Sequence, residues 1–111
     1  MEQRTMLEGR RADAVLRLAA LRRDHGAIVE SARSVSTDDE HDPEGATIAF
    51  ERAQLESLID QTLRKIAELD DAIARLDGGT YGSCASCGAA IAAERLEARP
   101  SATTCVSCAS R

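Results

Sequence analysis

Apolar residues recur along this chain in alternating steps of four and three, in two segments of equal length. In each segment, seven of the nine repeat positions are apolar. This spacing is typical of a heptad seam on a helix, whereas a half-buried strand alternates every two residues. The pattern therefore predicts two long helices, each with one apolar stripe. The seam positions are Leu7, Arg11, Ala14, Leu18, Leu21, His25, Ile28, Ala32 and Val35, and then Ile48, Arg52, Leu55, Ile59, Thr62, Ile66, Leu69, Ile73 and Leu76.

The stretch TDDEHDPEGA, residues 37–46, separates the two seams and is rich in carboxylates. Folding the chain back there places Val35 opposite Ile48 and Leu7 opposite Leu76, so both seams are buried along their length. At about 1.5 Å per helical residue, each arm is roughly 40 Å long. We predict a mainly α protein in which residues 1–77 form a long antiparallel two-helix coiled-coil hairpin with an acidic tip at 37–47. An intermolecular coiled coil built from the same seams is the alternative.

Local signals mark both ends of the second helix. Asp42 followed by Pro43 is a suitable N-cap and first helical residue, because proline at that position loses no required N–H. Gly78 and Gly79 follow the last seam residue and allow the positive φ at which helices end. Among the polar seam residues, His25 is interpreted as a core or edge histidine, since no carboxylate pattern in the sequence pairs with it.

All four cysteines lie in the last third of the chain, as two C-x-x-C pairs separated by 17 residues. Four thiolates at this spacing suit tetrahedral zinc, and a site closed by four protein ligands leaves no position for a catalytic water. We predict one structural Zn²⁺ in a small C-terminal four-cysteine zinc finger, residues 78–111. Two disulfides or an iron–sulfur centre are the alternatives. The predicted ligands are Cys84, Cys87, Cys105 and Cys108.

Composition narrows the function further. The net charge of −5 argues against general nucleic-acid binding, and we expect no sequence-specific contact with DNA. The N-terminus has no apolar run typical of a signal peptide, and no stretch is long and apolar enough to span a membrane. We therefore expect a cytoplasmic protein. Nothing in the sequence has the spacing of a nucleophilic or acid–base catalytic set, so we expect no enzymatic activity.

The C-terminal motifs resemble a known family. Tyr81-Gly82, the first C-x-x-C with its glycine, Ile91, the run RLEARP at 95–100 and the second C-x-x-C are similar to the zinc finger of the DksA/TraR family of transcription regulators. The resemblance implies a protein that binds bacterial RNA polymerase and inserts a coiled-coil finger through the secondary channel to modulate initiation. It also implies that an acidic residue and an alanine two positions later act at the finger tip.

Counted back from Cys84, those two tip positions are Glu44 and Ala46. Better-known members of the family have aspartate at the first, so Asp42 is a second candidate for the working carboxylate. Gln61 and Glu68 stand where some members carry basic residues for guanosine tetraphosphate, which argues against a response to that ligand. We expect a monomer. The alternative functions are a zinc-stabilised coiled-coil scaffold or dimerisation protein, and a thiol redox sensor.

Overall fold

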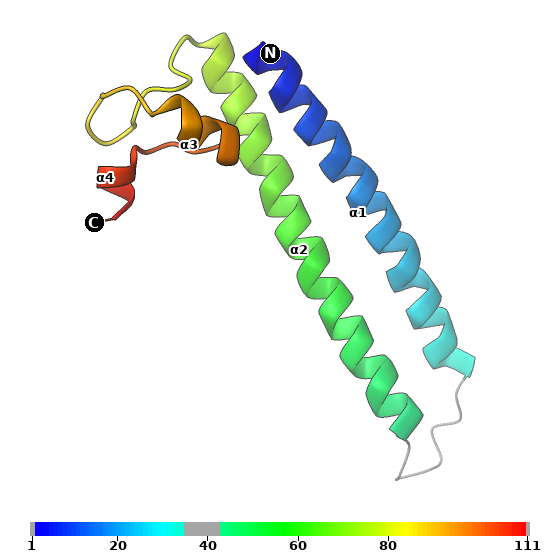
Figure 1. Cartoon of the computed structure of the whole chain (residues 1–111). Helices are drawn as coiled ribbons and strands as arrows, with labels where there is room; N and C mark the ends of the chain where they lie inside the picture. Colours follow the sequence, from blue (N-terminus) through cyan, green and yellow to red (C-terminus); the bar gives the residue numbers. More distant parts are fainter. Residues whose placement is uncertain (1, 35–42, 111) are drawn as a thin grey trace. The chain divides into compact units, whose positions relative to one another are not determined.

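Two long helices carry most of the described chain, and two short helices belong to its C-terminal third (Figure 1). The computed structural model describes residues 2–34 and 43–110. Within these residues there is no β-strand, and no helix is long and apolar enough to cross a membrane. The predicted mainly α fold, with two long packed helices and a cysteine-rich C-terminus, is confirmed. The helices are α1 (Gln3–Ser34), α2 (Pro43–Asp77), α3 (Ala93–Ala98) and α4 (Val106–Ala109).

The chain divides into two compact units, which are described separately. The first comprises Met1–Asp13 and Lys65–Arg111, and the second comprises Ala14–Arg64. Each unit contains one stretch of α1 and one stretch of α2, paired antiparallel. The domain boundary expected between residues 77 and 78 stays a prediction.

The core of the first unit lies between the start of α1 and the second half of α2. Leu7, Leu69 and Ala72 form a cluster of buried side chains, and partly buried apolar side chains surround it. Leu7 and Leu69 are seam positions, whereas Ala72 is not. The burial of Ala72 shows that α2 presents a face wider than the seam here. The surrounding side chains are Met6, Ile73, Leu76 and Tyr81.

Charged pairs flank this core. Arg4 bonds to Asp77, and the Arg11 guanidinium bonds to the Asp70 carboxylate. Arg11 stands on the seam but only half-buries its side chain, so its charge reaches a partner at the edge of the helix pair. Exposed ion pairs of this kind add little to the free energy of folding, yet they favour one antiparallel register of the two helices over registers shifted by a few residues.

The second unit packs the rest of α1 against the first half of α2. Ala14, Leu18 and Leu21 are buried on α1, and the buried residue of α2 in this unit is polar Thr62. The Thr62 hydroxyl donates to the Leu58 carbonyl at 2.8 Å, so its burial leaves no orphaned polar group. The other described seam residues of this unit are half-buried, except Arg52, which is exposed.

His25 contacts a carboxylate across the helix pair of the second unit. Its Nε2 lies 3.0 Å from Glu56 Oε2, and Arg52 reaches the same oxygen at 3.4 Å. The prediction of a core or edge histidine agrees with this half-buried position, but the sequence pattern did not reveal the carboxylate partner. The partner lies 31 residues away, and only the helix register brings it near.

These contacts define the register within each unit. In the pairs Arg4–Asp77, Arg11–Asp70 and His25–Glu56, the two residue numbers always add to 81. In the predicted alignment, which paired Leu7 with Leu76, the numbers of facing residues add to 83, so the two helices are shifted by two residues relative to that prediction. The difference is half a helical turn, and Leu76 still packs against the cluster that contains Leu7.

Both ends of α2 follow the sequence signals as far as the structure describes them. The helix begins at Pro43, while the proposed cap Asp42 lies outside the described residues. At the other end, Thr80 N–H donates to the Arg75 carbonyl and Gly79 N–H to the Leu76 carbonyl, with Gly79 at φ +80°. This pattern is a Schellman motif, and it stops the helix directly before the cysteine module.

Candidate metal centre

The structure brings the four cysteine sulfurs together. One sulfur from each of Cys84, Cys87, Cys105 and Cys108 lies within 4.8 Å of the other three. The Cys87 and Cys105 sulfurs are 3.8 Å apart. Four sulfurs at tetrahedral corners about 2.3 Å from zinc are separated by about 3.8 Å, so the cluster has the size that a zinc ion requires.

Each C-x-x-C pair forms a tight backbone knuckle. Gly88 N–H donates to the Cys84 carbonyl, and Ala109 N–H donates to the Cys105 carbonyl, both at 2.9 Å. Gly88 has φ +78°, a conformation that glycine adopts without strain. Ala85 N–H donates to the Thr103 carbonyl at 2.8 Å and joins the two halves of the module. The backbone hydrogen bonds of each knuckle therefore hold its two sulfurs on the same side of the backbone without help from a metal ion.

Cys84, Cys105 and Cys108 have thiol pKa values shifted in different directions by their surroundings. Backbone N–H groups, first that of Cys105, lower the pKa of the Cys84 thiol to about 6. The Cys108 backbone lowers the pKa of Cys105 in the same way. The neighbouring thiols, first that of Cys105, raise the pKa of Cys108 to about 12. Ionisation of Cys108 beside its neighbours is therefore unfavourable unless a cation offsets the repulsion, which is the role of a divalent metal.

A small apolar core lies beside the sulfurs. Cys84, Ile91 and Leu96 are buried together, so one predicted ligand is itself part of the core. Ile91 N–H donates to the Gly82 carbonyl at 2.7 Å, and Arg95 Nε donates to the Thr104 carbonyl at 2.8 Å. The run RLEARP thus supports the metal centre through Leu96 packing and through an arginine that bonds to the backbone just before Cys105.

Arg75 and Tyr81 connect this module to α2. The Tyr81 hydroxyl donates to the Pro100 carbonyl at 2.8 Å, and its ring packs against both core clusters of the first unit. The Arg75 guanidinium reaches the Ser101 and Ala102 carbonyls at 3.4 and 3.5 Å and lies 6.0 Å from the Tyr81 ring centre. Arg75 carries no local sequence signal for this role, because its carbonyl partners lie 26 and 27 residues away.

The predicted tip residues are only partly covered by the structure. Glu44 and Ala46 are exposed in the first turn of α2, whereas Asp42 lies outside the described residues. An acidic side chain in the first turn of a helix is favoured by the helix dipole. Glu44 is therefore held on a regular helix with its carboxylate open to solvent.

Comparison with known proteins supports the zinc module most directly. Residues 79–111 match the family described as prokaryotic dksA/traR C4-type zinc finger. The protein named RNA polymerase-binding transcription factor DksA, from two strains of Caulobacter vibrioides, is 43% identical over 47 residues. That match covers 42% of this chain and 33% of the relative, so the chain spans about a third of the length of the curated proteins it matches.

A solved structure extends the likeness to the fold. Transcription factor DksA2 from Pseudomonas aeruginosa superposes with a TM-score of 0.82 at 23% identity, covering 98% of this chain and 78% of that chain. Fold and site together define a mainly helical protein whose C-terminal module is built round one structural zinc ion, as predicted. Residues 79–111 therefore form a zinc finger of the dksA/traR type, in agreement with the resemblance noted in the sequence.

Proposed function

We propose that this protein is a non-enzymatic transcription regulator that binds bacterial RNA polymerase. The observation that carries the proposal is the zinc finger at residues 79–111, and it is supported by the similarity of this chain to proteins named RNA polymerase-binding transcription factor DksA. In this proposal Cys84, Cys87, Cys105 and Cys108 hold the zinc. A polymerase partner places the protein in the cytoplasm, and we expect it to act as a monomer.

The finer proposal is that the helix pair enters the secondary channel and that its acidic end acts near the catalytic centre. Glu44 and Ala46 support this role because both are exposed at the start of α2. Asp42 shares the assignment as the second candidate carboxylate. An anionic side chain placed there competes for basic groups or for Mg²⁺, and so shifts the balance between open and earlier promoter complexes.

Two measurements test the proposal in sequence. Zinc-loaded protein is first mixed with purified polymerase core enzyme, and binding is followed by co-migration on a sizing column. The lifetime of open complexes is then measured on a ribosomal-type promoter. We expect binding and a changed lifetime, and failure to bind core enzyme would defeat the proposal as a whole.

Substitutions separate the tip assignment from binding. Glu44→Ala and Asp42→Ala are expected to keep binding and to reduce the effect on complex lifetime. Glu68→Ala is the control, since Glu68 is also exposed on α2 but lies in the first unit. If both tip variants keep the full effect, the tip assignment is wrong although polymerase binding stands. Guanosine tetraphosphate is expected to leave the lifetime unchanged, since Gln61 and Glu68 replace the cations that would hold it.

A further inference from the structure

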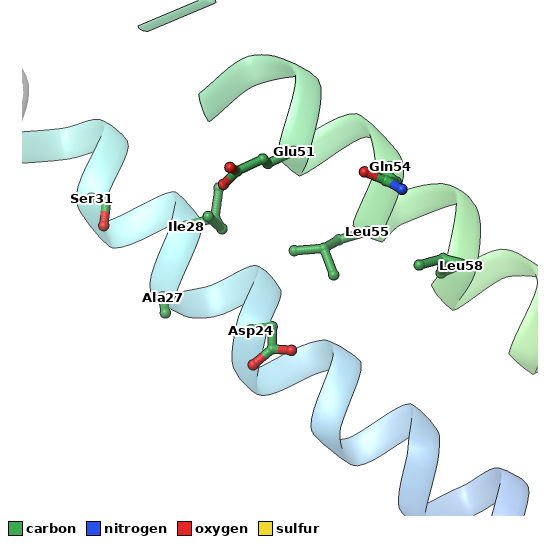
Figure 2. A pocket seen from close by; sticks show the side chains of 8 residues that line it. All are labelled: Asp24, Ala27, Ile28, Ser31, Glu51, Gln54, Leu55 and Leu58. Atoms are coloured by element: carbon green, nitrogen blue, oxygen red, sulfur yellow. The ribbon is translucent and has the colours of Figure 1, made fainter. Parts of the chain in front are cut away.

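A groove of about 420 Å³ lies between α1 and α2 in the second unit (Figure 2). Leu55 points into the space between the two helices, and Ile28 stands on the facing helix. Together with Leu58 these side chains give the groove an apolar floor, and all three are only half-buried. The floor is therefore apolar surface that the helix pair leaves in contact with water.

The two helices line this groove with the same spacing. From α1 come an acid, an apolar residue four positions later and a small polar residue after three more: Asp24, Ile28 and Ser31. From α2 come Glu51, Leu55 and Leu58 at identical intervals. Because the helices are antiparallel, the two acids lie at opposite ends of the groove. Each set covers seven helical steps, so the carboxylates are separated by roughly 10 Å along the helix axis.

The charge in this groove is of one sign. Asp24 and Glu51 are the charged residues among those that line it, and neither has an ion pair within the described residues. Across the helix pair of the same unit, Glu56 is matched by His25 and Arg52. The groove thus combines an apolar centre with an unmatched negative charge at each end, a pattern that attracts an occupant with positive ends.

We propose that this groove binds a basic amphipathic helix of a partner protein. A helix laid along it presents side chains seven residues apart on one face, about 10.5 Å from each other, which matches the separation of the two carboxylates along the groove axis. Basic residues at those two positions reach Asp24 and Glu51. Apolar residues three and four positions after the first rest on Ile28, Leu55 and Leu58, as in other helix-in-groove complexes. The occupant completes a three-helix arrangement, and the inference does not rest on the polymerase proposal.

The test uses the full zinc-loaded protein and a labelled synthetic helical peptide. The peptide carries arginines seven residues apart and leucines three and four positions after the first arginine, in an alanine background. Binding is followed by fluorescence anisotropy at low and high salt, and amide chemical shifts locate the peptide. We expect saturable, salt-sensitive binding with shifts concentrated in residues 24–31 and 51–58.

Two matched pairs of substitutions distinguish binding in the groove from a general effect of the protein's net charge. Asp24→Asn with Glu51→Gln is expected to weaken binding about tenfold, because two ion pairs at the rim are lost. Asp60→Asn with Glu68→Gln removes the same charge from exposed positions outside the groove and is expected to leave binding within twofold. Circular dichroism checks that all variants stay helical, which is expected because none of these carboxylates is buried.

Four outcomes overturn the proposal. In the first, the peptide does not bind. In the second, both pairs of substitutions weaken peptide binding equally, which would show that binding depends only on the net charge of the protein. Spermidine binds with the same dependence on Asp24 and Glu51 while the peptide does not, which would make the groove a polyamine site. Sedimentation shows a dimer of this chain whose formation protects residues 51–58, in which case the occupant is a second copy.

Discussion

The two compact units use the same helix pairing but bury different amounts of it. In the first unit Leu7 and Ala72 are 0% exposed and Leu69 is 2% exposed, and the cysteine module contributes further contacts through Tyr81. In the second unit the seam residues of α2 other than Thr62 are half-buried or exposed. Two helices alone bury only one stripe each, and a third element is needed to close the remaining face.

The difference in burial suggests different roles for the two units, one in stability and one in contact with a partner. The first unit has its own third element, the zinc module, and is expected to be the more stable part. The second unit has exposed large apolar residues on both helices, among them Leu16, Phe50 and Leu63. Incompletely covered helices are suited to contact a partner, because that partner supplies the missing cover.

Removal of zinc is expected to have the largest effect on stability, and that effect should be confined mainly to the first unit. Structural zinc contributes on the order of 10 kcal/mol to the folding of small modules, so chelation at neutral pH should unfold residues 78–111. Loss of the module, Tyr81 included, should also expose part of the cluster that contains Ala72, and the adjacent helix ends should lose protection from exchange. Hydrogen exchange measured residue by residue, with and without chelator, checks this.

The control for zinc removal is the second unit, whose amides are expected to change little. Far-ultraviolet circular dichroism should show that most helix remains, since α1 and α2 hold the greater part of the described helical residues. Purified protein that contains no metal and keeps its full thermal stability would contradict the structural role of zinc.

Truncation of one leucine in each unit compares the two cores directly. Leu7→Ala is expected to destabilise the zinc-loaded protein by about 3 kcal/mol, because a fully buried side chain leaves a cavity. Leu55→Ala is expected to cost about 1 kcal/mol, because half of that side chain already contacts water. Urea denaturation measures both values. Equal losses would show that the second unit is as tightly packed as the first.

Thr62 offers a way to strengthen the weaker unit. Its hydroxyl bonds to a carbonyl of its own helix, and Thr62→Val replaces that hydroxyl with a buried methyl group while the carbonyl keeps its helical partner. The expected gain is about 0.5 kcal/mol, read from the urea midpoint. Thr5→Val, on the exposed face of α1, is the control and should change the midpoint less. A destabilised Thr62→Val variant would mean that the hydroxyl is required for packing.

Much of the fold was accessible from the sequence because heptad spacing and helix-stop signals are local. The seams predicted the two helices, and Gly79 ends α2 as expected. The cysteine spacing likewise predicted the metal centre, since each C-x-x-C brings two sulfurs together within one knuckle. These features depend on neighbours a few residues away, and they are the ones that the sequence pattern specifies.

The remaining features depend on residues that are distant in sequence. Equal seam lengths predicted an alignment half a turn away from the observed one, since the ion pairs that favour a register involve Asp70 and Glu56, which are off the seam. Ala72 is buried in a cluster that combines Leu7 of α1 with residues of α2 and Tyr81, which are far apart in sequence. The Arg75 contacts with carbonyls near Pro100 arise in the same way. Pairing each polar residue of the first seam with acids beside the second seam would have found Glu56.

The smallest predicted effect concerns that carboxylate and its dependence on pH. The hydrogen bond from His25, followed by that from Arg52, lowers the pKa of Glu56 below its usual value of 4.5. In the unfolded chain the carboxyl returns to its usual pKa, so in the interval just below that value the unfolded state binds more protons. The stabilisation of the folded state by the Glu56 contacts is therefore fully present above the pKa of the unfolded chain. It is lost as the pH falls through the lower pKa of the folded state.

Glu56→Gln should accordingly lower the Tm by only about 2 °C at pH 7, as expected for an exposed pair. Between about pH 5 and pH 3 the Tm of the original protein should fall more steeply than that of the variant, so that the two curves converge. Glu68→Gln is the control, because Glu68 has no ion pair within the described part of the chain, and its curve should run parallel to the original. Parallel curves for Glu56→Gln would mean that the contact between His25 and Glu56 does not stabilise the second unit in solution, and that its few buried side chains alone hold its helices together.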